Sequence, residues 1–255
     1  MNYILAKLLS YKIKDKKKRK EYREDLCSIS FSLFSPNKIS GKNNKIIILN
    51  PNGKERKLRW YEKINGLKII IKGENNIVKL ARPFGGFSNC EIFIRGKNNV
   101  FQKEKSRFGS SDTKFHMSAK GDNRLMQIGE DFSIGSGLIW NEEDNTHLCI
   151  GNYVMCSINI HIRNSDSHVI LDDKNNIINK SSNLSIGNHV WLGANSSILK
   201  GINIPNNTIV GYGSVVTKSF SEEYTIIAGN PARTIKQGVH WEKDKHNDYV
   251  KKHQL

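Results

Sequence analysis

A histidine in the middle of the chain stands where a regular repeat of aliphatic residues is interrupted. On both sides of the stretch IRNSDSHVILDD, from Ile162 to Asp173, an aliphatic side chain recurs at every sixth position, and the next one is due at His168. Histidine suits general-base catalysis because its ordinary pKa is about 6.5. A lone histidine is usually structural or simply exposed. Here the position favours a functional residue, because His168 also opens a polar excursion that an ordinary corner does not need.

The repeat predicts how this histidine is positioned. A period of six fits neither an α-helix, with a period near 3.6, nor an ordinary strand, with a period of 2. It fits a triangular coil with three short strands per turn, one inward aliphatic residue on each side and Gly or Asn at the corners. The aliphatic positions are Ile186, Leu192, Ile198, Ile204, Val210 and Val216, with Val190, Ser196, Ile202, Thr208 and Ser214 four places after the first five.

Earlier parts of the chain follow the same period more loosely. Ile150, Cys156 and Ile162 are in register with the later run, and Ile128, Ile134 and Trp140 form a displaced set. The segments IKGENNIV and IRGKNNVF, residues 71–78 and 94–101, are near copies 23 residues apart. They predict coils with extra residues at a corner. The repeat resumes at Ile186, and the sequence leaves open whether the residues after His168 form a loop or a degenerate coil.

We therefore expect three parts. Residues 1–35 are basic and helical, with a short apolar face that either packs on the body or, within residues 1–20, docks on an anionic membrane or polysaccharide. Residues 36–225 form the coils, irregular before about 125, with a loop excursion at 165–183. Residues 226–255 begin with an Asn-Pro turn, continue as a polar helical segment and cap the open end of the solenoid.

Charge and cysteine content limit the partners and the compartment. The 255 residues contain 40 Lys and Arg against 24 Asp and Glu, a net charge of +16, which attracts anions. Nucleic-acid binding through residues 12–20 would rest on charge alone, so we expect none. The four cysteines show no C-x-x-C spacing and predict reduced thiols and no metal site, with Cys149 and Cys156 in the core. The apolar start is too short to span a bilayer and has no cleavage site. We expect a cytoplasmic protein, with peripheral contact to the inner membrane as an alternative.

The repeat, together with the segments VGYGSVVTKSF and IIAGNPARTIK, resembles the hexapeptide-repeat acyltransferases, and within them the sugar O-acetyltransferases that modify capsular sialic acid or similar glycans. This resemblance implies a mainly β fold, a left-handed parallel β-helix. It implies a homotrimer with active sites between subunits, and acetyl-CoA as co-substrate without a metal. It implies an O-acetyltransferase that modifies a sugar hydroxyl of a bacterial capsule or lipooligosaccharide, sialic acid included, by direct transfer.

The resemblance also assigns roles to residues. His168 is the general base, and Trp191 on the next coil packs against pantetheine or donates its N–H near the reacting carbonyl, unless it is only an external aromatic residue. His161, Asn164 and Asp166 are candidates for acceptor binding. Asp166, Asp172, Asp173 or a backbone carbonyl could orient the imidazole. The candidate contacts to acetyl-CoA are Ala194, Tyr212, Gly213, Thr217, Lys218, Arg233 and Lys236, of which the basic residues suit phosphates.

Two other functions stay open at this point. An amino-sugar N-acetyltransferase of nucleotide-sugar metabolism would have the same fold and co-substrate. A non-catalytic β-solenoid that only binds a ligand would need neither His168 nor acetyl-CoA.

Overall fold

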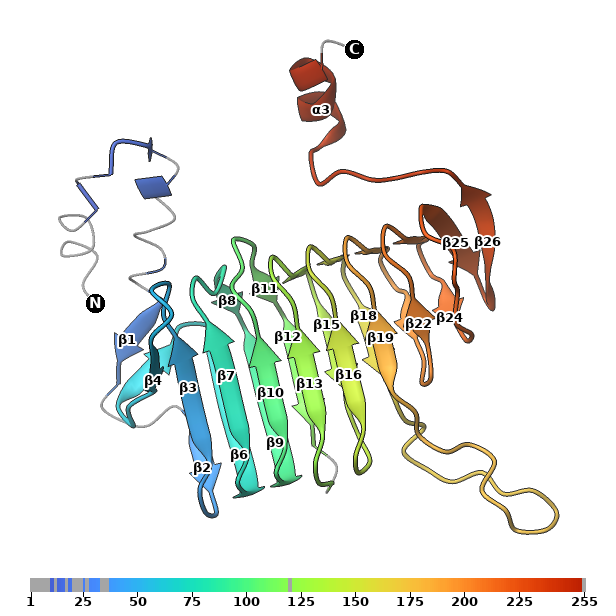
Figure 1. Ribbon diagram of the computed structural model, residues 1–255, viewed down its shortest axis with the longest axis horizontal. Helices are drawn as coiled ribbons and strands as arrows, with labels where there is room; N and C mark the ends of the chain where they lie inside the picture. The colour runs from blue at the N-terminus through green and yellow to red at the C-terminus, as the bar shows by residue number, and fades with distance from the viewer. Residues whose placement is uncertain are drawn as a thin grey trace.

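The chain forms a stack of triangular coils, as the period of six predicts (Figure 1). A computed structural model describes residues 10–11, 13–16, 18–19, 25, 28–32, 37–118 and 121–253. Most of the basic segment expected to be helical, residues 1–35, lies outside the described residues, and Ile29–Phe31 within it form a strand instead. Three sheets, here called sheets 1, 2 and 3, form the sides of the stack, and each has eight strands within the described part of the chain. Each coil passes from sheet 1 to sheet 2 and then to sheet 3, and neighbouring coils pair in parallel.

The strands are short. Sheet 1 consists of β2 (Lys38–Ser40), β6 (Leu67–Glu74), β9 (Cys90–Lys97), β12 (Thr113–Met117), β15 (Gly137–Trp140), β18 (Ile160–Arg163), β21 (Ser197–Ile198) and β24 (Val215–Val216). Sheet 2 consists of β3 (Lys45–Leu49), β4 (Glu55–Lys57), β7 (Ile77–Ala81), β10 (Val100–Lys103), β13 (Leu125–Ile128), β16 (His147–Ile150), β19 (Leu184–Ile186) and β22 (Asn203–Ile204). Sheet 3 consists of β8 (Phe87–Ser88), β11 (Ser110–Ser111), β14 (Ser133–Ile134), β17 (Met155–Cys156), β20 (Trp191–Leu192), β23 (Ile209–Val210), β25 (Thr225–Gly229) and β26 (Ala232–Gln237). A separate antiparallel pair joins β1 (Ile29–Phe31) to β5 (Glu62–Ile64).

The aliphatic positions of the repeat form the core. All six side chains from Ile186 to Val216 are at most 3% exposed, and the small or β-branched residues four places later are buried as well. The near copies at 71–78 and 94–101 lie side by side, with Ile71 opposite Ile94 and Val78 opposite Phe101. One expected position was wrong. Ile139, not Trp140, pairs with Ile162 and enters the core, because the corner between β14 and β15 is one residue shorter than a regular one.

A column of polar side chains runs inside the corner between sheets 1 and 2. The amide oxygen of Asn44 accepts from Asn76 at 3.0 Å, and that of Asn76 accepts from Asn99 at 3.0 Å. Arg124 takes the next position: its backbone N–H and its Nε both donate to Asn99 at 3.0 Å. Gly121 leaves room for the guanidinium, since a Cβ there would lie 3.2 Å from its carbon. The column gives the buried corners of successive coils hydrogen-bond partners that an aliphatic residue could not provide.

The residues between β18 and β19 form a loop rather than an extra coil. Coils farther along the chain repeat every 18 residues, as in the hydrogen bond from Asn188 to Asn206. Asn152 bonds to Asn188 across 36 residues in the same way, and β16 pairs directly with β19. The additional length therefore leaves the stack at the corner between sheets 1 and 2. It projects as the long loop after β18 in Figure 1, and a bridge between Leu171 and Ile177 closes its outer part.

The C-terminal part returns along the solenoid. β25 continues sheet 3 in parallel with β23, and β26 pairs with β25 in antiparallel fashion at the end of the stack. After β26 the chain turns back along the coils to α3 (His246–His253), which has no buried residue (Figure 1). The end of sheet 3 is thus formed by a strand pair, and α3 lies elsewhere. No described helix has the length and hydropathy needed to cross a membrane.

A buried lysine gives a test of the fold. Lys103 is 2% exposed, its ammonium lies 3.5 Å from the carbonyl oxygen of Phe84, and burial lowers its pKa to about 8. Between about pH 8 and 10.5 this lysine is therefore protonated in the unfolded chain and neutral in the folded chain. Because the unfolded state binds more protons, the free energy of unfolding rises with pH in this range, by up to about 3 kcal/mol for this group. We expect Lys103→Met to raise the unfolding free energy by about 2 kcal/mol at pH 7 and to remove this rise. Urea unfolding of both proteins at pH 7 and pH 10 checks this; the same pH dependence in both would contradict it.

Candidate active site

The loop that carries His168 starts from a fully buried asparagine. Asn164 donates its amide to the Asn141 side chain at 2.7 Å and accepts from the backbone N–H of Glu142 at 2.8 Å. It continues the polar column of the same corner, and its backbone carbonyl accepts from the Ser182 N–H at the far end of the loop. Asn164 was a candidate for acceptor binding. Its burial and its internal hydrogen bonds argue instead for a role in fixing the base of the loop.

A second set of contacts holds the loop on both sides of His168. The side chain of Asn179 donates to the His168 carbonyl at 2.8 Å and accepts from the Ile170 N–H at 2.7 Å. It also donates to Asp166, which forms an ion pair with Lys200, and Lys200 donates to the Asn179 carbonyl at 2.7 Å. The hydrogen bond from Lys200 lowers the pKa of Asp166. The backbone at His168 is therefore held by Asn179 of the same loop, which Lys200 of the neighbouring coil contacts in turn, although the loop is exposed.

The imidazole of His168 itself faces solvent. Within the described residues it makes no hydrogen bond. None of the three acids considered as its partners, Asp166, Asp172 and Asp173, contacts its ring. Asp166 binds Lys200 and Asn179, and Asp172 caps the turn at Lys174 and Asn176. The chain thus presents an exposed imidazole on a backbone that Asn179 holds in place.

Trp191 lies on a different side of the solenoid. It belongs to β20 in sheet 3, between Met155 and Ile209, and is 37% exposed on the outer face. His168 leaves from the corner between sheets 1 and 2, and His161 is exposed on sheet 1. One chain therefore does not bring Trp191 together with His168, and a site that uses both needs a second chain.

The residues expected to bind acetyl-CoA fall on the last coils. Ala194 and Gly213 are neighbours at the corner between sheets 3 and 1, where the Gly213 N–H donates to the Ala194 carbonyl at 2.8 Å. Tyr212 is exposed beside them and its hydroxyl accepts from Asn195. The exposed Thr217 and Lys218 follow β24, and the ammonium of Lys218 lies 5.6 Å from the centre of the Phe220 ring. Arg233 and Lys236 are exposed on β26.

The three cysteines within the described residues, Cys90, Cys149 and Cys156, show no sign of nucleophilic chemistry. Cys156 is buried at the core position of β17, and burial raises its pKa. Burial also raises the pKa of Cys149 and Cys90. Such thiols are poor nucleophiles at neutral pH, so a covalent acetyl-cysteine step has no support here.

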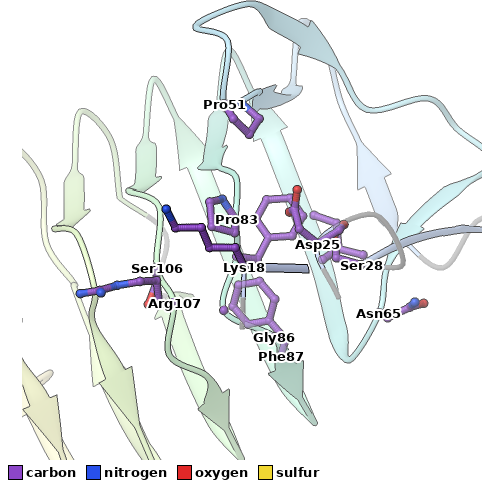
Figure 2. Close-up of a pocket in the computed structure, with 13 residues that line it drawn as sticks. Lys18, Asp25, Ser28, Pro51, Asn65, Pro83, Gly86, Phe87, Ser106 and Arg107 are labelled. Carbon is purple, nitrogen blue, oxygen red and sulfur yellow. The ribbon is translucent and has the colours of Figure 1, made fainter. Parts of the chain in front are cut away.

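A cavity of about 660 Å³ lies at the other end of the molecule. Figure 2 shows it beside Pro83 and Phe87, with Ser106 and Arg107 on one side. None of its described lining residues belongs to the expected site. The candidate site is thus an exposed surface of the last coils rather than an enclosed pocket of one chain.

Comparison with known proteins agrees with the fold. No protein-family model matches the sequence. A putative acetyltransferase of Dictyostelium discoideum is 30% identical over 138 residues, 52% of this chain and 70% of that protein. The chain belongs to the hexapeptide-repeat acetyltransferase family.

Other members of the hexapeptide-repeat family match shorter parts. The polysialic acid O-acetyltransferase of Escherichia coli O1:K1 is 32% identical over 115 residues, 45% of this chain and 37% of that enzyme. The chain spans 27% to 61% of the length of four of its curated relatives. The crystal structure of the polySia-specific acetyltransferase NeuO has a TM-score of 0.63 at 24% identity, covering 85% of this chain and 92% of that one. This last likeness establishes the shared fold.

Sequence reasoning missed three residues that shape the site. Asn179 and Lys200 hold the loop, and Trp241 from the C-terminal segment lies 6.1 Å from Trp191, measured between ring centres. Nothing in the period of six marks them, because all three lie outside the core positions of the repeat. The one available signal was that the loop is rich in Asn and Asp, which favours side-chain hydrogen bonds to its own backbone.

Proposed function

We propose that the protein is an acetyl-CoA-dependent O-acetyltransferase that modifies a sugar hydroxyl of an anionic bacterial surface polysaccharide, of a capsule or lipooligosaccharide, such as one containing sialic acid. The observation that carries the proposal is the exposed His168 on a loop fixed by Asn179, in a chain of the hexapeptide-repeat family. A matched relative named polysialic acid O-acetyltransferase supports this acceptor class.

The chemistry requires a base and a positioned donor. The acceptor hydroxyl gives its proton to the His168 imidazole as its oxygen attacks the thioester carbonyl. The tetrahedral intermediate then breaks its C–S bond, the acetyl group stays on the sugar oxygen, and the leaving thiolate takes the proton back from His168. An N–H donor near the carbonyl stabilises the negative charge on its oxygen, and we assign this role, or packing against the pantetheine arm, to Trp191.

The site is proposed to lie between two chains of a homotrimer. His168 and Trp191 lie on different sides of one chain, so rotation about a threefold axis would bring His168 of one chain to sheet 3 of the next. The outer loop carries five aliphatic side chains that are exposed in the single chain: Val169, Ile170, Leu171, Ile177 and Ile178. Such a cluster is suited to contact with a neighbouring subunit.

The basic residues of the last coils are proposed to bind the phosphates of CoA. Lys236 is exposed on β26, and Lys218 and Arg233 lie on the same end of the solenoid. The group of corner residues at Ala194, Tyr212, Gly213 and Thr217 would border the rest of the co-substrate. Acetyl-CoA supplies the activated acetyl group, and no metal is needed for this step.

We expect Lys236→Glu to raise KM for acetyl-CoA by about 5-fold and to leave kcat within about 2-fold, because phosphate contacts stabilise ground and transition states alike. Steady-state kinetics at two ionic strengths check this, since added salt should reduce the difference. Lys57→Glu, which changes another exposed lysine on β4 at the other end, is the matched control. A fall in kcat at unchanged KM would contradict a phosphate role.

The acceptor is proposed to be anionic because the chain carries a net charge of +16. His161 and Asp166, exposed near the loop, are the candidates for contacts to it. The free thiols of Cys90, Cys149 and Cys156 fit a cytoplasmic enzyme, and a peripheral membrane contact would involve residues 1–20, most of which lie outside the described residues.

The direct test is mass spectrometry of sialic acid oligomers, neutral oligosaccharides and amino sugars incubated with enzyme and acetyl-CoA. We expect an added acetyl group on the anionic oligosaccharide that mild alkali removes, as an ester requires. An alkali-stable acetyl group would mean N-acetylation and would contradict the proposal. Absence of transfer to every acceptor would favour the non-catalytic alternative.

A further inference from the structure

The chain segment after β26, residues 238–245, is fixed on the outer face of sheet 3 at two points. The Trp241 indole N–H donates to the His189 carbonyl at 2.9 Å, and the Trp241 side chain is 6% exposed. The Lys243 ammonium donates to the Ser133 hydroxyl at 2.8 Å and lies 3.3 Å from the centre of the Phe108 ring. We call this segment the C-terminal arm. Figure 1 shows it running back along the coils from β26 toward α3.

The arm places one tryptophan beside another. The Trp241 ring stacks on the His189 imidazole, with 4.5 Å between ring centres and 11° between planes. The same ring lies beside Trp191, at 6.1 Å and 47°. His189 is itself fixed, because its Nδ1 lies 3.0 Å from the Asn207 side-chain oxygen on the adjacent coil. The order of contacts is thus Asn207, His189, Trp241 and Trp191.

A large side chain on a flat sheet face has several rotamers available, and ordering it costs conformational entropy. Trp191 projects from such a face and remains partly exposed. The buried Trp241 ring occupies the space on one side of it. This contact removes rotamers in which the Trp191 indole would turn toward the arm. The position of Trp241 is itself fixed by its hydrogen bond to the His189 carbonyl and its stacking on the His189 ring.

We infer that Trp241 is a positioning residue for acetyl transfer, and that the C-terminal arm acts by holding the Trp191 indole in its reactive orientation. This inference rests on the proposed function, because it requires Trp191 to contact the co-substrate or the reacting carbonyl. It assigns to the arm a role that neither the repeat nor the candidate contacts to acetyl-CoA include. Misplacement of a group near the reacting atoms by about 1 Å can cost about 100-fold in rate.

The test is a double-mutant cycle in the full-length protein. We expect Trp241→Ala to lower kcat about 10-fold with KM for acetyl-CoA within about 3-fold, and Trp191→Ala to lower kcat about 100-fold. Because Trp241 acts through Trp191, the double variant should be no slower than Trp191→Ala, within about 2-fold. Trp241→Phe keeps a ring on His189 and should recover most of the loss. If the two losses in kcat multiplied in the double variant, the inference would be overturned. A kcat of Trp241→Ala equal to that of wild type would also overturn it.

A second measurement separates this inference from the proposed function. The near-ultraviolet circular dichroism of Trp191 is obtained by subtracting the spectrum of Trp191→Ala from that of wild type. We expect this signal to shrink when it is measured in the Trp241→Ala background, to be largely retained in Trp241→Phe, and to stay unchanged in Trp60→Ala, a control that removes a tryptophan 71% exposed at the far end. An unchanged Trp191 signal in the Trp241→Ala background would overturn the inference even if the enzyme is active. Absence of acetyl transfer by wild type would instead refute the proposed function.

Discussion

Replacing His168 with alanine is expected to lower kcat by about 10²–10⁴-fold, the range that a positioned general base contributes. The imidazole is exposed and its backbone is held on both sides by Asn179, so alanine removes the proposed base without disturbing a core. We therefore expect thermal unfolding, oligomeric state and acetyl-CoA affinity to stay as in wild type. The measurements are single-turnover kinetics, calorimetry of acetyl-CoA binding and light scattering.

The matched control is His147→Ala, which removes an exposed histidine from β16 in sheet 2. It should leave kcat within about 2-fold, since surface substitutions away from a site rarely matter. If His168→Ala retained wild-type turnover, or lost activity only together with its stability, His168 would not be the base. In the second case, the loss of activity would have to be traced to the loop contacts of Asn179 and Asp166.

Replacing Arg124 with alanine is expected to lower the free energy of unfolding by about 4 kcal/mol or more. The side chain is 1% exposed and donates to the side chain of Asn99 and to the carbonyls of Asn141, Met117 and Arg95. Each buried acceptor left without a partner costs about 1–3 kcal/mol, and the emptied volume adds to this. Burial lowers the pKa of Arg124 to about 10, so it remains charged at neutral pH.

Urea unfolding at pH 7 checks the Arg124 prediction. Arg95→Ala is the control, because that side chain is exposed on β9 one coil away and should cost less than about 0.5 kcal/mol. Arg124→Lys should recover only part of the loss, since an ammonium cannot reach the separate acceptors that the guanidinium fork serves. Equal stabilities of Arg124→Ala and Arg95→Ala would show that the polar column is not important for folding.

The repeat alone was sufficient to predict the core of the last coils, whereas it left open whether the residues after His168 form a loop or a coil. A period of six leaves little freedom: the aliphatic residue at every sixth position from Ile186 to Val216 must point inward, and each of these six does. The assignment of Trp140 failed because one corner, at Gly135 to Gly137, is a residue shorter, and a period cannot reveal a single deletion between two apolar neighbours. The polar column was also missed, because Asn76, Asn99 and Arg124 recur at unequal spacings that become meaningful only once the coils are stacked.

The site was harder to predict than the core for a physical reason. Its side chains lie on the outside of the coils, where no packing rule restricts them, and its contacts join residues far apart in sequence. The bond from Lys200 to Asp166 spans 34 residues, and that from Trp241 to His189 spans 52. Asn164 illustrates the same difficulty, because a polar residue shortly before His168 looked suited to binding an acceptor and instead is buried in the column.

The measurement that tests the central claim most directly is complementation between two inactive variants. If the site joins His168 of one chain to Trp191 of another, a mixture of His168→Ala and Trp191→Ala chains, unfolded together and reassembled, contains sites with both native residues. Random mixing in a symmetric trimer restores about a quarter of the wild-type sites, so about a quarter of wild-type turnover should return. If turnover stays at the level of the separate variants although mixed oligomers form, the site lies within one chain and the account is wrong.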